Sequence, residues 1–152
     1  LDATIFVDLN IRHPWFQNDQ LEEILVAARS VKLNSDELSE ISGQSITSDD
    51  NIHRVARRLL HRYSIDSLWV TVGDRGAFYF DINDKSEFAA APVVEHLVDP
   101  VGAGDAFSAA VIDGILKADA PEQILANAVQ FAAKICQLRG GTTTDRDFYQ
   151  SG

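Results

Sequence analysis

Apolar residues along this chain form short continuous runs in some segments and helix-spaced stripes in others, a pattern typical of an α/β fold. Residues 3–9 are β-branched and aromatic, so they predict a buried strand, and the polar residues after them predict a functional loop. A helix is expected from Asp19 to about residue 29. Its expected buried face carries Leu21, Ile24, Leu25 and Ala28.

The next segments predict a short strand and two helices. Residues 31–33 predict the strand, and residues 34–42 predict a short helix that Gly43 ends. Ser48 and the two aspartates after it predict the start of a longer helix. The residues that this helix should bury are Ile52, Val55, Ala56, Leu59 and Leu60.

Two further strands are expected at residues 67–72 and 77–81. They flank the glycine-bounded segment 73–76, so the sequence predicts a β-hairpin. The other expected elements are a β segment at 93–98 and helices at 106–116 and 121–138. Because strands otherwise alternate with helices, we expect a mostly parallel sheet with an antiparallel part at the hairpin.

The length and net charge of the chain limit the classes of function that it can have. The 152 residues suffice for one compact core, and 45% of them are hydrophobic. A formal net charge of -10 disfavours nucleic acid and anionic membranes as partners, because both would be repelled. No apolar run approaches the roughly 20 residues needed to cross a bilayer, and the first residues carry no secretion signal, so a cytoplasmic location is expected.

The single cysteine, Cys136, excludes an intrachain disulfide. It lies in an apolar pattern with Phe131, Ile135 and Leu138. This setting predicts a buried structural thiol in preference to a reactive one.

The sharpest chemical feature is Gly102-Ala103-Gly104-Asp105, between an expected strand and an expected helix. Small residues let the backbone approach a ligand, and free amides at a helix start can surround the charge on a transferring phosphoryl group. Asp105 lies in the first helical turn, where the helix dipole favours its charged form and it can accept a proton from an alcohol. Taken alone, these residues favour the alternative of an ordinary turn and helix start without catalytic function.

Asn34 and Glu37 form a second candidate pair. Their three-residue spacing at a helix start puts both side chains on one side, where a hard metal ion bridged by water could meet nucleotide phosphates. The structural alternative is a helix cap with acidic residues in the first turn. The two residues alone leave both interpretations open.

The ten residues 98–107, VDPVGAGDAF, resemble the second signature of the PfkB (ribokinase-like) carbohydrate kinase family along their whole length. The resemblance implies that Asp105 deprotonates the acceptor hydroxyl. The anion hole it implies comes from Gly102, Ala103 and Gly104. Pro100 departs from the family pattern, which commonly has threonine there, so no hydroxyl contact is expected at this position.

Other segments also resemble this family. Asn34-Ser35-Asp36-Glu37 is similar to its N-x-x-E motif, which implies that Asn34 and Glu37 hold Mg2+ through water. Residues 71–76, TVGDRG, resemble its T-x-G-x-x-G segment beside the nucleotide, although turn geometry alone would explain both glycines. The nucleotide contacts implied by the resemblance are Thr71, Gly73 and Gly76, with Asn127 and Gly140 as secondary ones. As alternatives, Asn127 is an exposed helix residue and Gly140 an ordinary helix stop.

The opening segment Asn10-Ile11-Arg12-His13-Pro14-Trp15 resembles the N-x-R segment of fructokinase-like and ketodeoxygluconate kinase-like members. Asn10 and Arg12 are therefore candidates for substrate contact, with Arg12 suited to a polar group or a phosphate. The alternative for Arg12 is an ion pair with one of the many acidic side chains.

The fold that the resemblance implies is a ribokinase-like three-layer α/β sandwich whose N-terminal portion is missing. Residues 1–152 are then expected to be the nucleotide-binding and catalytic C-terminal portion of a sugar kinase. Neither the G-x-x-x-x-G-K-[ST] phosphate loop nor the protein-kinase motifs occur in the sequence, so these two kinase classes are disfavoured.

The implied reaction moves the γ-phosphoryl group of ATP to a hydroxymethyl group of a sugar or sugar acid. ATP and Mg2+ are the implied cofactors, and a monovalent cation and a homodimer of the full-length protein stay open. The alternatives are a kinase of a nucleoside or vitamin precursor and a nucleotide-binding module without turnover. The isolated chain is expected to be inactive, since the sugar-binding half is absent from it.

Overall fold

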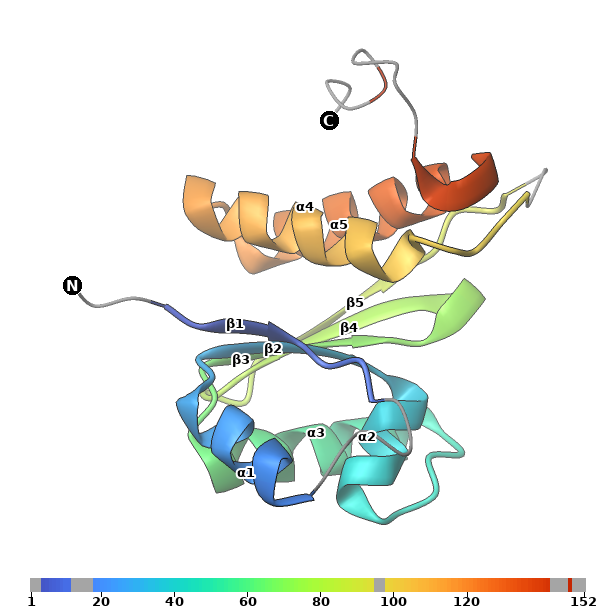
Figure 1. Ribbon diagram of the computed structural model, residues 1–152. Helices are drawn as coiled ribbons and strands as arrows, with labels where there is room; N and C mark the ends of the chain where they lie inside the picture. The colour runs from blue at the N-terminus through green and yellow to red at the C-terminus, as the bar shows by residue number, and fades with distance from the viewer. Residues whose placement is uncertain (1–3, 12–17, 95–97, 143–147, 149–152) are drawn as a thin grey trace. The chain divides into compact units, whose positions relative to one another are not determined.

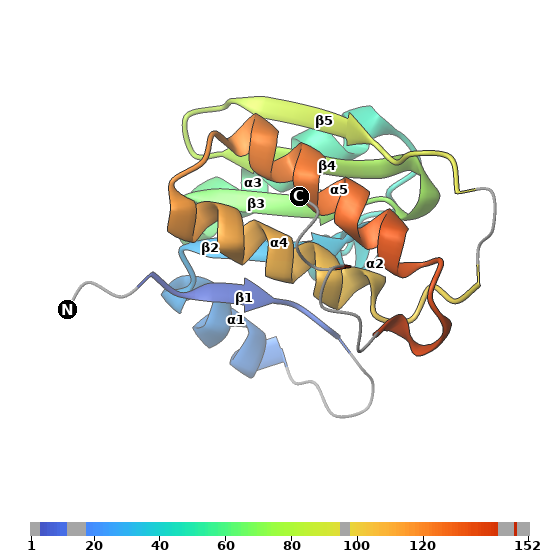
Figure 2. The same ribbon diagram turned by 90° about the horizontal axis from the view of Figure 1, so that it is seen from above.

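The computed structural model describes residues 4–11, 18–94, 98–142 and 148 (Figure 1). Two compact units divide the chain: Leu1–Gly73 with Phe78–Glu87, and Asp74–Ala77 with Phe88–Gly152. Five strands form one sheet in the order β1-β2-β3-β4-β5, with β1 and β5 at its edges (Figure 2).

The first three strands are parallel. They are β1 (Phe6–Asp8), β2 (Ser30–Asn34) and β3 (Ser67–Thr71), and in the register Asp8 of β1 stands beside Lys32 of β2. All three were predicted, and β1 is shorter than the expected run of residues 3–9. Because parallel strands have their carboxyl ends at the same edge, the loops after β1, β2 and β3 all leave the sheet on one side.

The predicted hairpin is confirmed. A short 3-10 turn, η1 (Gly73–Arg75), joins β3 to β4 (Gly76–Asp81), and the amide of Ile82 donates to the carbonyl of Asp66, which makes the two strands antiparallel. The fifth strand, β5 (Ser86–Ala90), turns back along β4. The sheet therefore combines a parallel part with an antiparallel end, as expected.

The expected β segment at residues 93–98 is wrong for its described residues. Val93, Val94 and Val98 form no strand, and residues 95–97 lie outside the described part. The strand of this region is β5, which begins seven residues earlier, where pairing with β4 favours an extended chain despite a weak apolar pattern. Pro92 has no amide to donate to a ladder, and the side chain of Val93 is 93% exposed, so these two residues do not favour a strand.

Three helices belong to the first unit and lie together on one face of its strands (Figure 1). They are α1 (Asn18–Ala27), α2 (Ser35–Ser42) and α3 (Asp49–Tyr63). All five residues predicted for the buried face of α3 are buried, and Ser48 caps this helix as expected. Leu21 and Leu25 of α1 and Ala28, just after this helix, are buried as predicted, whereas Ile24 is exposed.

The second unit contains two helices that pack side by side, α4 (Ala103–Lys117) and α5 (Pro121–Ile135) (Figure 2). Gly114 permits their close approach, since a Cβ atom there would lie 2.6 Å from Cγ1 of Ile124. After α5 a 3-10 turn, η2 (Arg139–Gly141), follows. Cys136 is half-buried, less than expected, and desolvation together with Asp99 raises the pKa of its thiol, which fits a structural role.

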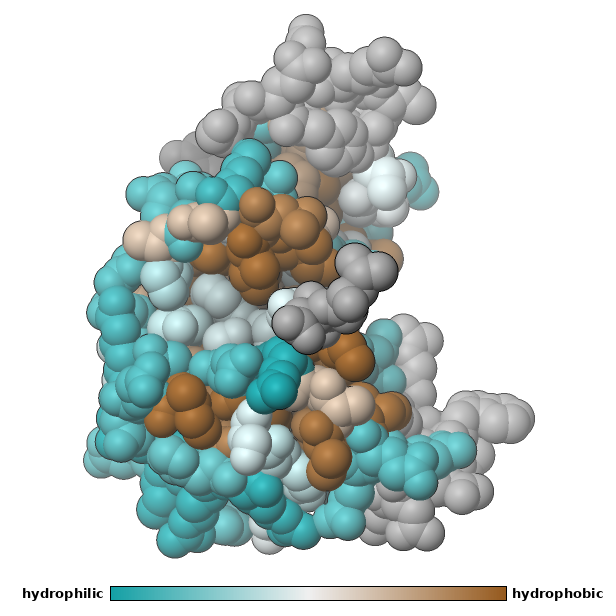
Figure 3. All heavy atoms as spheres, turned by 90° about the vertical axis from the view of Figure 1, so that its left-hand side faces the viewer, coloured by the Kyte–Doolittle hydropathy of each residue, from teal (hydrophilic) through white to brown (hydrophobic). Residues whose placement is uncertain are grey.

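Some apolar side chains face solvent near the edge strand β1. Ile5, just before β1, is 45% exposed and Val26 of α1 is 68% exposed. Figure 3 shows patches of apolar surface between polar ones on one side of the molecule. In the part of the chain that the structure describes, no helix has the length and apolar character needed to span a membrane.

Candidate active site

The glycine turn before α4 is the first part of the candidate site. Gly102 is the N-cap residue of α4, with φ of 85°, a left-handed conformation that favours glycine. No side chain among the described residues caps this helix start, so its leading amides are available to an anion. The amide of Ala103 is the exception, because it donates to the carbonyl of Pro100 at 3.2 Å.

Asp99 holds this turn in place. Its Oδ1 accepts a hydrogen bond from the amide of Val101 at 3.0 Å, and its Oδ2 accepts one from the amide of Gly140 at 3.2 Å. The carboxylate thus ties the glycine turn to η2, which lies 41 positions later in the chain. The sequence analysis quoted Asp99 within the motif and gave it no role. A signal was present, since an aspartate two residues before a turn amide commonly accepts from it.

The two glycine segments touch directly. Gly141 has φ of 70°, and a Cβ atom there would lie 2.4 Å from the carbonyl oxygen of Val101 and 3.2 Å from Cα of Gly102. The structure therefore brings two separately predicted segments together, the anion-hole residues and the turn that contains Gly140. Gly140 itself has φ of 77°, and a Cβ atom there would meet nothing within 4 Å.

Asp105 lies in the first turn of α4, as predicted. Its side chain is exposed, and among the described residues its carboxylate has no hydrogen-bond or ion-pair partner. The neighbouring residues Ala106, Phe107 and Ser108 are buried and anchor the helix start. This combination gives a rigid backbone with a carboxylate that solvent and ligands can reach, which a general base requires.

The start of α2 is built differently. Asn34 is the N-cap residue, and its Oδ1 accepts from the amide of Glu37 at 2.8 Å, while Oε2 of Glu37 accepts from the amide of Asn34 at 2.7 Å. This is a complete capping box, the structural alternative for the pair. Oε1 of Glu37 also accepts from the amide of Ile11 at 3.2 Å.

A partly buried ion pair lies near Glu37. Nζ of Lys32 is 3.0 Å from Oδ1 of Asp8, and the two residues face each other in the register of β1 and β2. Burial raises the pKa of the Glu37 carboxyl, while the amides of Asn34 and Ile11 and the positive charge of Lys32 oppose that increase. The sequence analysis missed Lys32 and Asp8; a lysine within an apolar strand pattern was the available signal.

Direct metal ligation by Asn34 and Glu37 does not fit, because Oδ1 of Asn34 and both carboxylate oxygens of Glu37 already accept amide hydrogens. Contact through water does fit, since each carboxylate oxygen has a second lone pair. Among the described residues, no three acidic, histidine or cysteine side chains are grouped to hold a metal. Mg2+ commonly keeps several waters and relies on substrate phosphates, so it needs no such group.

In the hairpin segment, the two glycines differ. Gly73 has φ of 64° and open space around the position of a Cβ atom. Gly76 has φ of 126°, and a Cβ atom there would lie 2.0 Å from the carbonyl oxygen of Ala89, so packing against β5 already requires glycine. Thr71 ends β3 and is half-buried. The nucleotide contacts predicted for these residues stay a prediction.

The remaining predicted residues lie on exposed positions or outside the described part. Asn10 is exposed and follows the buried Leu9, whereas Arg12 lies outside the described residues. Asn127 is an exposed residue of α5 whose Oδ1 accepts from Nε2 of Gln123 at 2.8 Å. This position agrees with the alternative considered for Asn127, an exposed helix residue, and its nucleotide contact stays a prediction.

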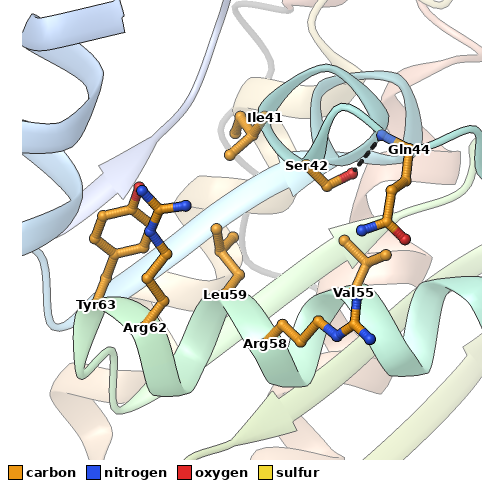
Figure 4. A pocket seen from close by; sticks show the side chains of 8 residues that line it. All are labelled: Ile41, Ser42, Gln44, Val55, Arg58, Leu59, Arg62 and Tyr63. Carbon is orange, nitrogen blue, oxygen red and sulfur yellow. Dashed lines mark hydrogen bonds between the residues drawn. The ribbon is translucent and has the colours of Figure 1, made fainter.

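A groove of about 290 Å³ lies between α2 and α3 and contains none of the predicted site residues (Figure 4). Apolar side chains and two arginines form its wall. The lining residues are Ile41, Ser42, Gln44, Val55, Arg58, Leu59, Arg62 and Tyr63.

Residues 2–147 match the family described as pfkB family carbohydrate kinase. A fructokinase from Klebsiella pneumoniae is 37% identical over 135 residues, which make up 85% of this chain and 42% of the fructokinase. A cytidine kinase from Thermococcus kodakarensis is 28% identical over 125 residues, 82% of this chain and 42% of that protein. The chain thus spans 42% of the length of each of these curated relatives.

A solved structure of a ribokinase from Arabidopsis thaliana, complexed with ribose and ATP, has the same fold. It matches with a TM-score of 0.80 at 22% identity and covers 91% of this chain and 43% of that chain. This likeness confirms the predicted ribokinase-like α/β fold.

Proposed function

Because the chain belongs to the pfkB family of carbohydrate kinases, we propose that it is the nucleotide-binding and catalytic portion of an ATP-dependent kinase. The proposed reaction transfers the γ-phosphoryl group of ATP to a hydroxymethyl group of a sugar or sugar acid. One observation carries the proposal: an uncapped glycine turn opens α4 directly before the exposed carboxylate of Asp105.

In this reaction Asp105 accepts the proton of the acceptor hydroxyl as that oxygen attacks the γ-phosphorus. The leading amides of α4 donate hydrogen bonds to the charge that develops on the phosphoryl oxygens, aided by the positive end of the helix dipole. The small residues that allow this approach are Gly102, Ala103 and Gly104. Asp99 and Gly141 support the mechanism because they hold the turn in one conformation.

The proposed metal site uses the start of α2. Asn34 and Glu37 would hold Mg2+ through water, in keeping with their occupied oxygens. When bound, Mg2+ would neutralise charge on the nucleotide phosphates. A monovalent cation is a further candidate cofactor.

Other residues of the proposal contact the substrates. The proposed nucleotide contacts are Thr71, Gly73, Gly76, Asn127 and Gly140, and the proposed acceptor contacts are Asn10 and Arg12. Open space beside Gly73 and the exposure of Asn10 support these assignments. The proposed location is the cytoplasm, where ATP is supplied.

The proposed whole enzyme contains more than this chain, which spans 42% of the fructokinase. The first strand, β1, is an edge strand beside exposed Ile5, which supports pairing with a further strand. We place the remaining acceptor-binding residues in that additional part. The 152-residue chain alone is then expected to bind nucleotide and to transfer no phosphoryl group at an appreciable rate.

A nucleoside acceptor is the second candidate, favoured by the cytidine kinase that shares 28% identity with this chain. The test is a product assay with fructose, a sugar acid and cytidine, on an enzyme that contains this chain. Phosphorylated sugar supports the proposal, phosphorylated cytidine supports the second candidate, and no product with any acceptor contradicts both.

Nucleotide binding can be tested on the chain itself. Calorimetry with ATP and Mg2+ should give heat, and amide signals should shift at residues 71–76 and 102–105. If the chain is folded and millimolar nucleotide causes neither heat nor amide shifts, the proposed nucleotide-binding function is wrong.

A further inference from the structure

The strands β1 and β2 separate at the edge of the sheet where α2 begins. Their ladder extends to Leu9, whose amide donates to the carbonyl of Lys32 at 2.9 Å. From there β2 passes directly into α2 at Asn34, whereas the segment after β1 leaves the sheet through Asn10 and Ile11. Amides that leave a ladder in a partly buried place need new acceptors.

The carboxylate of Glu37 accepts a hydrogen bond from a backbone amide of each of these two segments. Oε2 of Glu37 is 2.7 Å from the amide of Asn34, and Oε1 is 3.2 Å from the amide of Ile11, which lies 26 positions earlier. Glu37 is only 7% exposed, so both bonds are shielded from water. Hydrogen bonds to an ionised acceptor are stronger than those between neutral groups.

The positive charge of Lys32 favours an ionised Glu37, whereas burial and the negative charge of Asp8 raise its pKa. Lys32 is 7% exposed, and its Nζ lies 3.0 Å from Oδ1 of Asp8. Only the ionised carboxylate offers two acceptor oxygens, and a glutamine would present one oxygen and one amide group. The arrangement therefore depends on glutamate at position 37.

We propose that Glu37 is a positioning residue that fastens residues 10 and 11, after β1, to the start of α2. The inference rests on the proposed function, in which Asn10 and Arg12 contact the acceptor, because Ile11 stands between these two residues. Through this bond the acceptor loop and the helix start assigned to the metal share one anchor. Glu37 thereby acts on acceptor binding without touching the acceptor.

Hydrogen exchange on the chain tests the bond directly. In Glu37→Gln the amide of Ile11 should exchange about tenfold faster or more, since one acceptor oxygen is lost. The amide of Val70, in the middle of β3, should keep its rate. Asp36→Asn is the matched control, because it removes one charge from the same helical turn and leaves both bonds of Glu37 in place; it should not change the Ile11 rate. Unchanged exchange at Ile11 in Glu37→Gln would overturn the proposal.

The effect of Glu37 on acceptor binding can be tested by steady-state kinetics of an active enzyme that contains this chain. Glu37→Gln should raise the KM for the acceptor about tenfold. Ile11→Pro removes the amide and keeps the carboxylate, so it should raise the acceptor KM in the same way and change the KM for MgATP less than about threefold. It also gives a second test if Glu37→Gln does not fold.

Other outcomes are distinguishable. A metal role alone would shift the Mg2+ requirement in Glu37→Gln and leave the acceptor KM of Ile11→Pro unchanged, which would overturn the proposal. A purely structural role would lower kcat and leave both KM values, which would also overturn it. A wild-type enzyme without any transfer would refute the proposed function, and the exchange experiment would still decide whether Glu37 anchors the loop.

Discussion

The two helix starts of the candidate site, at α2 and at α4, solve the same problem in opposite ways. At α2, Asn34 and Glu37 supply the acceptors that the first amides need. At α4, Gly102 supplies no side chain, and the carboxylate of Asp105 stays exposed. The first helix start is complete without a ligand, and the second has donors to offer.

The difference lies in where each turn gets its rigidity. The α2 start is rigid because its own side chains close the capping box. The α4 start is held from outside, by Asp99 and by contact with Gly141. Because Asp99 and Gly141 hold the turn, its free amides can stay oriented toward a ligand. Preorganised catalysis uses this arrangement. Changes at α4 should therefore lower turnover most, and loss of the Asn34 cap at α2 should mainly lower stability.

The largest effect is expected for Asp105→Asn in an active enzyme. It is nearly isosteric and removes the proton acceptor, so kcat should fall by about a hundredfold to ten-thousandfold. Nucleotide affinity should stay nearly constant, because backbone amides bind the phosphates. Steady-state kinetics and calorimetry measure the two quantities separately.

Asp113→Asn is the matched control for this change. Asp113 lies on the same helix and pairs with Lys117 at 2.7 Å in solvent, so its loss should leave kcat within about twofold. Near wild-type kcat in Asp105→Asn, with chemistry rate-limiting, would return Asp105 to the role of an ordinary first-turn residue.

The support behind the α4 turn can be removed with Gly141→Ala. Its Cβ atom would lie 2.4 Å from the carbonyl oxygen of Val101, in a backbone with φ of 70°, so a loss of about 2–4 kcal/mol in the free energy of unfolding is expected. Gly140→Ala is the control, since its φ of 77° is similar and its Cβ atom meets nothing. Urea denaturation should show a cost at least about 1 kcal/mol larger for Gly141→Ala. Equal costs would mean that strain in φ, and not the contact with Val101, makes glycine necessary.

A smaller effect is expected at the capped helix. Asn34→Ala removes the acceptor for the amide of Glu37 and should lower the free energy of unfolding by about 1 kcal/mol. Asn34→Asp keeps an acceptor of similar capping strength, so its stability should stay close to that of the wild type. If Asn34→Ala were neutral in denaturation experiments, the capping box would not contribute to stability.

The smallest effect concerns pH. Burial raises the pKa of the Glu37 carboxyl above 4.5, so the folded state binds this proton at a higher pH than the unfolded chain does. Glu37 therefore opposes folding at neutral pH, and this cost decreases as the pH falls through the folded-state pKa toward 4.5. Glu37→Gln should lack this gain on acidification, whereas Asp36→Asn should keep it. Denaturation at several pH values above 4.5 gives the two slopes, and identical slopes for wild type and Glu37→Gln would contradict the shift.

Local patterns predicted the local structure well. Gly43 ends α2 in a left-handed conformation, Ser48 caps α3, and a hairpin follows β3, each from signals within a few residues. The strand β5 was missed because its extended form depends on pairing with β4 and not on its own apolar pattern.

In the candidate site, too, local features were predictable from the sequence and long-range contacts were not. Asp105 and the Asn34–Glu37 pair were visible in sequence because each belongs to a helix start. The bonds of Asp99 to Gly140 and of Glu37 to Ile11 join residues 41 and 26 positions apart. No local pattern encodes such contacts, because they depend on which chain segments the fold places side by side.

The close approach of α4 and α5 at Gly114 couples two positions in evolution and in protein engineering. An alanine at 114 would be the better helix former by up to about 1 kcal/mol, and yet its Cβ atom would overlap Cγ1 of Ile124 at 2.6 Å. We therefore expect that the gain in helix propensity is realised only when residue 124 becomes smaller. Positions 114 and 124 should covary in size among relatives that keep this helix pair, and redesign of either helix should treat them as one unit.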